Sequence, residues 1–262
     1  MGGNALAITR ERFSTWERQL NVKELKFTGE YFVPGKADAR MEADHLERYR
    51  FACQYVAGKS VLDIACGAGY AAPMYVAADV ASYLGVDISP ELVESANEYY
   101  ASENAAFVHG DITTFDCGRR FDVISCFETI EHVPNYKMAI QNLIQLLTPG
   151  GMLLMSSPNR HVTTPCAELL TDKPRNPFHV QEFLPAELLA ELNAAGLTAS
   201  MSDVYGQRLC RIPRNRVLRA AYKVFAGNPK KKASPEVKPL DGRTPRYFLI
   251  RATRAAEMKK SA

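Results

Sequence analysis

The stretch Val61-Leu62-Asp63-Ile64-Ala65-Cys66-Gly67-Ala68-Gly69-Tyr70 decides the fold of this 262-residue chain. Residues 61–65 form a short, mainly apolar run of the kind that makes a strand buried on both faces. Gly67 and Gly69 permit a sharp turn and a close backbone approach by a ligand, and residues 70–78 predict a short helix. Because a helix N-terminus points unpaired N–H groups at a ligand, this strand, turn and helix predict a nucleotide-binding site.

Size and composition restrict the class of protein. Hydrophobic residues make up 47% of the chain and charged residues 23%, which is ordinary for a soluble globular protein. No apolar run approaches the roughly 18 residues that a membrane helix needs, and the first residues lack the pattern of a secretory signal. The six cysteines are scattered without a C-x-x-C pair, which favours reduced thiols in a cytoplasmic protein over disulfides or a zinc site.

Strands and helices alternate along the rest of the chain. Ser89 and Pro90 mark a clear boundary, since serine is a preferred helix cap and proline a preferred first helical residue. Predicted strands cover residues 82–87, 105–109, 121–126, 152–156, 197–204 and 246–252, and predicted helices cover residues 41–57, 90–100, 136–147 and 185–194. This alternation predicts an α/β fold with a doubly wound, mostly parallel sheet.

Four regions follow from this pattern. Residues 1–40 hold aromatic side chains among charges and are predicted to form a cap or lid, while residues 41–207 form the ligand-binding core. Residues 208–244 carry eleven Lys and Arg against two acidic residues, a net charge of +9. They are either a solvated insertion or a basic lid for an anionic substrate or a membrane surface. Residues 245–262 supply the last core strand and a basic tail.

Acidic residues near the strand ends indicate which ligand binds. Gly67-x-Gly69-x-x-Ala72 fits the dinucleotide fingerprint, and Asp87 follows Gly67 by twenty residues, where a ribose-binding acid belongs. Alone, this pattern would also suit a nicotinamide dehydrogenase. Asp63, beside the turn, disfavours a pyrophosphate and favours a ligand with amino and sulfonium groups. Asp111 and Ile112 offer an acceptor and an apolar surface to an adenine.

Taken in order, these motifs resemble those of class I S-adenosylmethionine-dependent methyltransferases. The matching segments are Asp63 to Gly69, Gly85-Val86-Asp87, Gly110-Asp111, Phe121 to Ile124 and Leu147 to Gly151. The resemblance covers roughly residues 40–205. It implies a Rossmann-like sheet of seven strands, mostly parallel, with the last strand antiparallel.

The resemblance also implies S-adenosylmethionine as the cofactor. Asp63 and the turn through Ala65, Gly67 and Gly69 would hold its methionine part. Ala65 stands where the family usually has glycine, and we expect the extra methyl group to be tolerated. The other implied contacts are Asp87 to the ribose, Ile88, Asp111 and Ile112 to the adenine, and Phe127 and Glu128 beside the methionine part.

Further segments bear on the acceptor. Those similar to bacterial sugar and polysaccharide O-methyltransferases are Phe27 to Gly35, His45 to Tyr49, Ser157 to Asn159 and Asn176 to Phe183, although Tyr31 replaces a common arginine. Phe127 to Val133 is instead similar to quinone-pathway O-methyltransferases. The resemblance therefore implies methyl transfer to a sugar hydroxyl of a glycan or glycosylated metabolite, with a small phenolic or lipid-like acceptor as the alternative.

Polar residues affect this choice. Asn159, Arg160 and Asn176, together with the basic insertion, favour a polar or anionic acceptor, whereas acceptor loops rich in aromatic and apolar side chains would favour the alternative. The insertion also admits an RNA-contacting protein without methyl transfer. Because it lacks the interleaved aromatic residues of a single-strand platform, we expect no nucleic-acid partner. The sequence leaves open whether the chain forms a homo-oligomer.

Two histidines are candidates for the catalytic base. A sugar hydroxyl is a poor nucleophile unless its proton is removed during attack, and an imidazole of near-neutral pKa suits that task. His132 follows the fourth strand, and His179 lies in the long loop expected to cover the acceptor. An alternative is that Asp122, Glu128 and Glu131 join these histidines around a divalent metal, but their spacing does not require one, and no metal is predicted.

Overall fold

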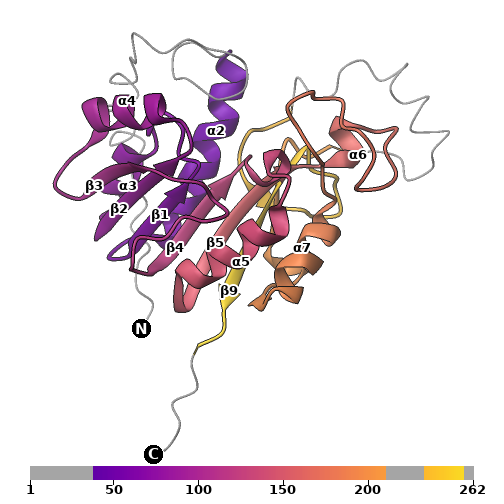
Figure 1. Cartoon of the computed structure of the whole chain (residues 1–262). Coiled ribbons are helices and arrows are strands. Elements are labelled where there is room, and N and C mark those ends of the chain that lie inside the picture. The colour runs from indigo at the N-terminus through magenta and orange to yellow at the C-terminus, as the bar shows by residue number, and fades with distance from the viewer. Residues whose placement is uncertain (1–37, 211–232, 257–262) are drawn as a thin grey trace, which may run out of the picture.

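The computed structural model describes residues 38–210 and 233–256. Most of the predicted cap, the centre of the basic insertion and the end of the tail lie outside these residues. The described strands form one mixed sheet in the order β3-β2-β1-β4-β5-β9-β7-β8, with β6 paired to β9 (Figure 1). They are β1 Ser60–Ile64, β2 Ser82–Asp87, β3 Ala105–His109, β4 Phe121–Phe127, β5 Leu147–Pro158, β6 Leu197–Thr198, β7 Val204–Gln207, β8 Lys238–Pro239 and β9 Tyr247–Arg254.

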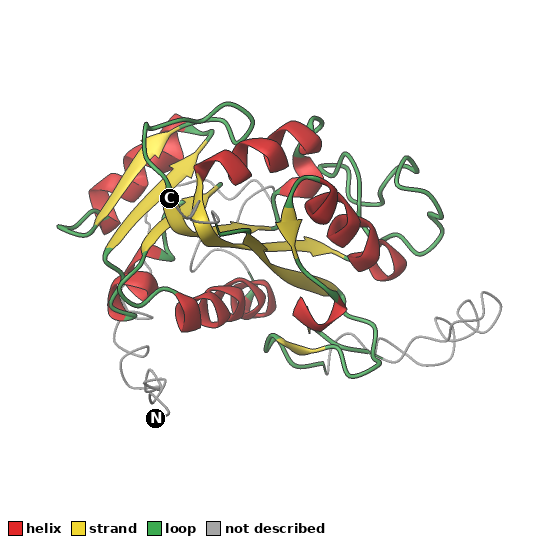
Figure 2. Cartoon of the chain, turned by 90° about the horizontal axis from the view of Figure 1, so that it is seen from below, coloured by secondary structure: helices red, strands yellow, loops and turns green. Residues whose placement is uncertain are grey.

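Helices cover both faces of the sheet, which lies between two hydrophobic cores (Figure 1, Figure 2). Tyr75 is fully buried in the core beneath α2, α3 and α4, and Leu143 and Leu192 are fully buried in the core beneath α5 and α7. The α-helices are α2 Ala39–Ala52, α3 Ala72–Ala77, α4 Pro90–Tyr100, α5 Tyr136–Leu146, α6 Arg160–Thr163 and α7 Pro185–Ala194. None of the helices described here is long and apolar enough to span a bilayer.

The predicted fold, with a mostly parallel sheet and an antiparallel last strand, is confirmed. β1 to β5 pair in parallel, and β9 runs antiparallel to both β5 and β7. The seven expected strands correspond to β1–β5, β7 and β9, and the described residues add β6 and β8, each two residues long. The predicted helix cap is also confirmed, since Ser89 Oγ accepts from the Leu92 N–H at 3.3 Å and Pro90 begins α4.

The strand predicted over residues 152–156 extends over Leu147–Pro158 as β5, and two further predicted elements differ more in form. The sequence predicts one strand over residues 197–204, but β6 is followed by the 3-10 helix η4 Met201–Asp203 before β7 begins. The Asp203 carboxylate accepts from the N–H and hydroxyl of Ser200, at 3.0 and 2.9 Å, and this side-chain pairing replaces a strand ladder. The helix predicted over residues 41–57 ends as α2 at Ala52 and tightens into the 3-10 helix η2 Cys53–Tyr55.

The parallel strands determine where a ligand can bind. Because β1, β2, β4 and β5 run in the same direction, their carboxyl ends meet at one edge of the sheet. In open α/β sheets this edge is the usual ligand site, close to the point where the strand order reverses. Here the order reverses between β1 and β4.

Candidate active site

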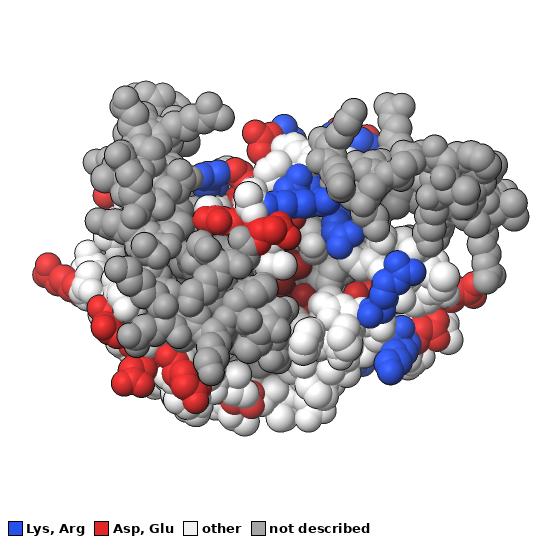
Figure 3. Space-filling view, turned by 90° about the horizontal axis from the view of Figure 1, so that it is seen from above, with Lys and Arg blue, Asp and Glu red and all other residues white. Residues whose placement is uncertain are grey.

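A cleft of about 1280 Å³ opens at this edge of the sheet. Pockets for one small molecule usually measure about 300–1,000 Å³, so the cleft has room for two ligands side by side. It is lined by residues that follow β1, β2, β3 and β4, by the inner side of α2, and by the loop before α7. Seen from above, acidic side chains lie in the floor of a hollow, and lysine and arginine side chains gather along one side of it (Figure 3).

One end of the cleft is built from the glycine turn and Asp87. The Gly67 N–H donates to Asp87 Oδ2 at 2.7 Å, and the Ser89 N–H donates to Oδ1 at 3.0 Å. Burial raises the pKa of Asp87, against the opposing effect of these N–H groups. Next to this carboxylate, the Ile88 side chain is 64% exposed although it is apolar. An acceptor and an open apolar surface therefore lie together where the sequence predicts ribose and adenine.

Asp111 and Ile112 line the same end. Asp111 Oδ1 accepts from the hydroxyl and the N–H of Thr113, at 2.6 and 2.7 Å, and these bonds lower the pKa of the carboxyl. Asp111 is therefore an ionised acceptor at the rim. Ile112 is 9% exposed and combines a place in the core with a surface toward the cleft.

The turn itself is open on the ligand side. Gly67 has a φ of +58°, and a Cβ at this position would meet nothing within 4 Å. A ligand can therefore approach this backbone closely. Ala65 also adopts a left-handed φ, of 56°, which costs an L-residue about 1–2 kcal/mol. The methyl group is accommodated in the fold, but it makes this turn strained.

The structure places two predicted cofactor residues behind the turn instead of in the cleft. Asp63 is fully buried, and its carboxyl accepts from the hydroxyls of Ser125 at 2.6 Å, Tyr83 at 2.9 Å and Tyr49 at 3.4 Å. Burial raises the pKa of Asp63 to about 7, although these hydroxyls oppose the shift. The carboxyl therefore ties strands and α2 together, because period-2 alternation turns it away from the cleft.

Gly69 serves packing. Its φ is +76°, and a Cβ there would lie 2.6 Å from the Phe107 ring and 2.7 Å from the Ala96 Cβ. Only glycine lets the turn pass this close to α4 and β3. Gly69 thus has the helix–strand packing role of the third glycine in dinucleotide folds and does not line the cleft.

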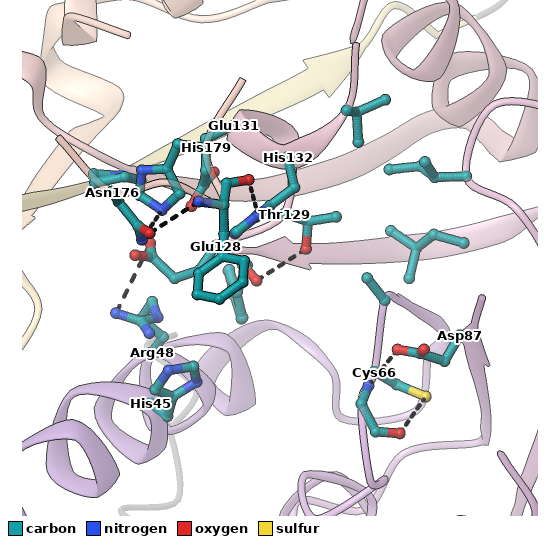
Figure 4. Close-up of a pocket in the computed structure, with 18 of the residues that line it drawn as sticks. His45, Arg48, Cys66, Asp87, Glu128, Thr129, Glu131, His132, Asn176 and His179 are labelled. Atoms are coloured by element: carbon teal, nitrogen blue, oxygen red, sulfur yellow. Dashed lines mark hydrogen bonds and ion pairs between the residues drawn. The ribbon is translucent and has the colours of Figure 1, made fainter. Parts of the chain in front are cut away.

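The other end of the cleft holds both predicted catalytic histidines. Their rings lie perpendicular, with centroids 4.9 Å apart (Figure 4). His132 Nδ1 lies 2.9 Å from the carbonyl oxygen of Phe178. His179 Nδ1 lies 2.8 Å from Glu182 Oε1, and its Nε2 lies 2.8 Å from Asn176 Nδ2. The structure therefore brings together two residues that are far apart in the sequence.

Hydrogen bonding assigns the tautomer of each neutral ring. A carbonyl oxygen only accepts, so His132 carries its proton on Nδ1 and its basic nitrogen is Nε2. His179 likewise donates from Nδ1 to the Glu182 carboxylate. The Phe178 N–H donates to Asn176 Oδ1 at 3.1 Å, which turns the Asn176 amide nitrogen toward Nε2 of His179.

The loop that carries His179 is fastened to the 3-10 helix η3 Ile130–His132. The backbone N–H groups of Val180 and Gln181 both donate to the Glu131 carbonyl oxygen, at 2.8 and 3.3 Å. Gln181 Nε2 donates to the carbonyl oxygens of Ile130 at 2.8 Å and Val133 at 3.1 Å. These four bonds set the distance between the two histidines.

Two glutamates complete this end. Glu128 has a left-handed φ of 51°, accepts from Ser156 Oγ at 2.7 Å and lies 3.9 Å from Arg48 Nη1. Glu131 is 1% exposed and accepts from Ser157 Oγ at 3.1 Å. Burial, with the nearby Glu128 carboxylate, raises the pKa of Glu131 well above its ordinary value. An uncommon backbone conformation beside a buried acid is typical of functional sites.

Comparison with known proteins identifies the family. Residues 37–200 match a family model described as a methyltransferase domain. The chain belongs to this methyltransferase family. A probable S-adenosylmethionine-dependent methyltransferase of Mycolicibacterium smegmatis is 33% identical over 175 residues, which cover 66% of this chain and 65% of that protein. The ubiquinone biosynthesis O-methyltransferase of Haemophilus ducreyi is 34% identical over 156 residues, which cover 53% of this chain and 65% of that protein.

These matches span slightly less than two thirds of the relatives' own length. Among solved structures, the N-methyltransferase NodS of Bradyrhizobium japonicum, in complex with S-adenosyl-L-homocysteine, superposes with a TM-score of 0.56 at 18% identity over 93% of this chain and 98% of that one. The [4+2]-cyclase SpnF gives 0.59 at 18% identity over 85% of each chain. At this identity the likeness concerns the fold.

The methyltransferase cleft also contains two residues of the His45 to Tyr49 segment, to which no role in the site was assigned from the sequence. Arg48 of α2 is 2% exposed, donates to Gln207 Oε1 at 2.7 Å and lies over the Tyr247 ring at 5.4 Å. His45, one turn earlier, contacts the Tyr70 hydroxyl through Nδ1 at 3.1 Å, and burial lowers its pKa well below the usual value. In sequence this segment carried only a resemblance to bacterial sugar and polysaccharide O-methyltransferases, and the packing of α2 against the sheet brings both side chains to the cleft.

Three polar residues named from the sequence lie elsewhere. Asn159 and Arg160, expected to favour a polar acceptor, are 2% and 1% exposed and do not line the cleft. Arg160 makes two bonds to the Glu187 carboxylate, at 2.6 and 2.8 Å, because a buried guanidinium requires a paired charge. Asp122, considered as a metal ligand, accepts from the Ser60 N–H at 2.9 Å at the opposite edge of the sheet.

Proposed function

We propose that this methyltransferase acts on oxygen, with S-adenosylmethionine at the Asp87 end of the cleft and the acceptor hydroxyl at the His132 end. The observation that carries the proposal is the cleft itself, which joins an acidic and apolar nucleotide end to a pair of fixed imidazoles. The family match and the relatives named as S-adenosylmethionine-dependent and O-methyltransferases support it.

The chain's own residues suit the cofactor. The open backbone at Gly67 admits the methionine part, Asp87 accepts from ribose hydroxyls, and Ile88 offers its exposed side chain to the adenine ring. Asp111 is an acceptor for the adenine amino group. When bound, S-adenosylmethionine supplies an already activated methyl group, so that alignment and exclusion of water do most of the catalytic work.

The acceptor must lose a proton as its oxygen attacks. Nε2 of His132 is basic in the tautomer that Phe178 imposes, and it belongs to the acceptor end of the cleft. We therefore assign His132 the role of base. His179, whose Nδ1 faces Glu182 and whose Nε2 faces Asn176, positions the acceptor in this mechanism.

The lining favours a phenolic or lipid-like acceptor. Phe178 is 44% exposed beside His132, and Phe127, Val133 and Tyr247 line the same end of the cleft. Asn159 and Arg160 are buried outside the cleft, so they no longer support a sugar as the acceptor. A sugar hydroxyl remains the second candidate, because Asn135, Arg175 and Asn176 still line the cleft.

Transfer of a labelled methyl group tests this proposal. The full chain is incubated with labelled S-adenosylmethionine and a panel of catechols, other phenols, glycans and nucleotide sugars, with and without divalent cations. We expect labelled methyl ethers of phenols to exceed those of sugars. A thermal shift caused by NAD and not by S-adenosylhomocysteine would overturn the proposal, because a ligand raises the melting temperature of the fold that binds it.

A further inference from the structure

Glu131, His132 and His179 form a cluster whose potential ligand atoms all lie within 4.8 Å of one another. We propose that this cluster binds one divalent transition-metal cation, which holds the acceptor oxygen in the methyl-transfer reaction. The inference deepens the function proposed above and rests on it. It also reassigns His132 from base to metal ligand, because one lone pair on Nε2 cannot serve both purposes.

Both imidazoles have the outer contacts of metal ligands. A histidine that binds a metal almost always donates its second ring N–H to a carboxylate or a backbone carbonyl. Here His179 Nδ1 faces the Glu182 carboxylate at 2.8 Å, and His132 Nδ1 faces the Phe178 carbonyl at 2.9 Å. Each contact leaves Nε2 as the nitrogen with a lone pair in the neutral ring.

The support for His179 extends one residue further. Glu182 is 1% exposed, and its Oε2 accepts from Thr163 Oγ1 at 2.5 Å. The contacts with His179 and Thr163 hold the Glu182 carboxylate in place, and a carboxylate in this position makes the imidazole a stronger donor to a cation.

Glu131 supplies a carboxylate whose movement is limited by the surrounding packing. It is 1% exposed, and its backbone carbonyl is held by the N–H groups of Val180 and Gln181. Its Oε2 accepts from Ser157 Oγ at 3.1 Å. A cation between this acid and the two imidazoles would offset the cost of a buried negative charge.

The spacing needs a small contraction. Two ligands of one cation at about 2.1 Å in tetrahedral geometry lie roughly 3.4 Å apart. The ligand atoms of the three residues now lie within 4.8 Å of one another, so side-chain rotations have to shorten the largest separation by up to about 1.4 Å to close the cluster. One contact must break, since the Asn176 amide now lies against Nε2 of His179. Asn176 is partly exposed and can swing toward solvent.

The donor set selects the metal class. Two imidazoles and one carboxylate suit Zn²⁺, Mn²⁺, Fe²⁺ or Co²⁺ better than Mg²⁺, which prefers oxygen ligands and retained waters. Three protein ligands leave coordination positions open, as in catalytic sites. A catechol-like acceptor with two adjacent oxygens fills two such positions. On binding, its hydroxyl releases a proton to solvent, and the cation stabilises the resulting oxyanion.

Methyl transfer then balances without a base. The oxyanion forms a C–O bond with the methyl carbon while the C–S bond breaks. The sulfur receives that electron pair and becomes the neutral thioether of S-adenosylhomocysteine. The methyl ether is a weaker ligand than the oxyanion and can leave.

Titration of the metal-free full chain with Co²⁺ tests the site directly. We expect saturation at one equivalent, with visible absorption bands of a protein-bound ion. His132→Gln and His179→Gln should each abolish saturable binding. Glu182→Gln, which removes only the outer charge, should weaken binding by about 10–100-fold. The matched control is His45→Gln, a histidine of the same cleft outside the cluster, which should leave Co²⁺ binding unchanged.

Other outcomes separate this inference from the proposed function. If the chain treated with a chelator binds S-adenosylhomocysteine and keeps full methyl transfer to phenols, the metal site is wrong and the O-methyltransferase assignment stands. If Co²⁺ binds equally well to the His132→Gln/His179→Gln double variant, the site lies elsewhere and the inference fails. If neither S-adenosylhomocysteine binding nor methyl transfer occurs with any cation, the proposed function itself fails.

Discussion

The carbonyl oxygen of Phe178 lies 2.9 Å from Nδ1 of His132, so a residue 46 positions later in the chain determines which nitrogen of this histidine carries a lone pair. That relationship depends on the loop staying against η3. Gln181, which is 7% exposed, supplies the side-chain bonds that hold it there, to the carbonyl oxygens of Ile130 and Val133.

Gln181→Met should therefore loosen the acceptor end while leaving the cofactor end intact. The change leaves two carbonyl groups without a side-chain donor, and we expect a loss of about 1–3 kcal/mol in the free energy of unfolding. Turnover should fall, while the affinity for S-adenosylhomocysteine stays within about twofold, because Gln181 does not line the cleft. Calorimetry measures the affinity for S-adenosylhomocysteine, and labelled-methyl assays measure turnover. Unchanged turnover would mean that the loop does not set the geometry of His132.

Gly69 and Gly58 form a matched pair for a test of packing. Both have left-handed φ angles, +76° and +69°, but a Cβ at Gly69 would meet the Phe107 ring at 2.6 Å, whereas a Cβ at Gly58 would meet nothing within 4 Å. Gly58→Ala should cost about 1–2 kcal/mol from the backbone alone. Gly69→Ala should cost about 1–3 kcal/mol more, because overpacking against the Phe107 ring adds to the same backbone cost. Urea denaturation measures both, and equal losses would contradict the packing role of Gly69.

The strand ends and the acids that follow them could be predicted from the sequence. Asp87 ends the apolar run of β2, and Asp111 follows the edge strand β3 by two residues. Their place at the carboxyl edge of the sheet therefore follows from parallel pairing. The direction of the Asp63 side chain could not be predicted in the same way. A strand covered on both faces has no polar face to show which side an internal acid takes.

The contributions of α2 and of the acceptor loop depend on tertiary packing. Arg48 reaches the cleft because α2 packs on the sheet beside Gln207, which is 159 residues away in sequence. The sequence named Asn159 and Arg160 for their polarity, but the same polarity serves equally to satisfy buried carbonyl and carboxylate groups. Residue type alone does not separate these two uses.

Asp87→Asn tests the cofactor end. The amide keeps the shape of the side chain but is neutral. The carboxylate that it replaces accepts from the N–H groups of Gly67 and Ser89 and is predicted to accept from the ribose hydroxyls. Hydrogen bonds to a charged group contribute about 1.5–3 kcal/mol, so the affinity for S-adenosylhomocysteine should fall by about 10–100-fold. Asp116→Asn is the control, since Asp116 accepts from a loop N–H outside the cleft. Equal affinities of the two variants would show that the ribose site is misplaced.

The buried carboxyl of Asp63 gives stability a defined dependence on pH. Burial raises its pKa from 3.8 to about 7 in the folded chain. The folded state therefore binds this proton more tightly than the unfolded state does. The stabilisation is complete below about pH 4 and is lost as the pH rises through 7. A shift of this size corresponds to something of the order of 4 kcal/mol.

Asp63→Asn should remove this dependence, because the amide stays neutral at every pH and can still bond to the hydroxyls of Tyr83 and Ser125. Urea denaturation at pH 4 to 8 measures the free energy of unfolding of both proteins. The wild type should lose stability relative to the variant between pH 4 and 7. The lowered pKa values of Asp111 and Glu182 act in the opposite sense, at lower pH, and are common to both proteins. Parallel curves for the two proteins would show that Asp63 is ionised in the folded chain at every pH tested.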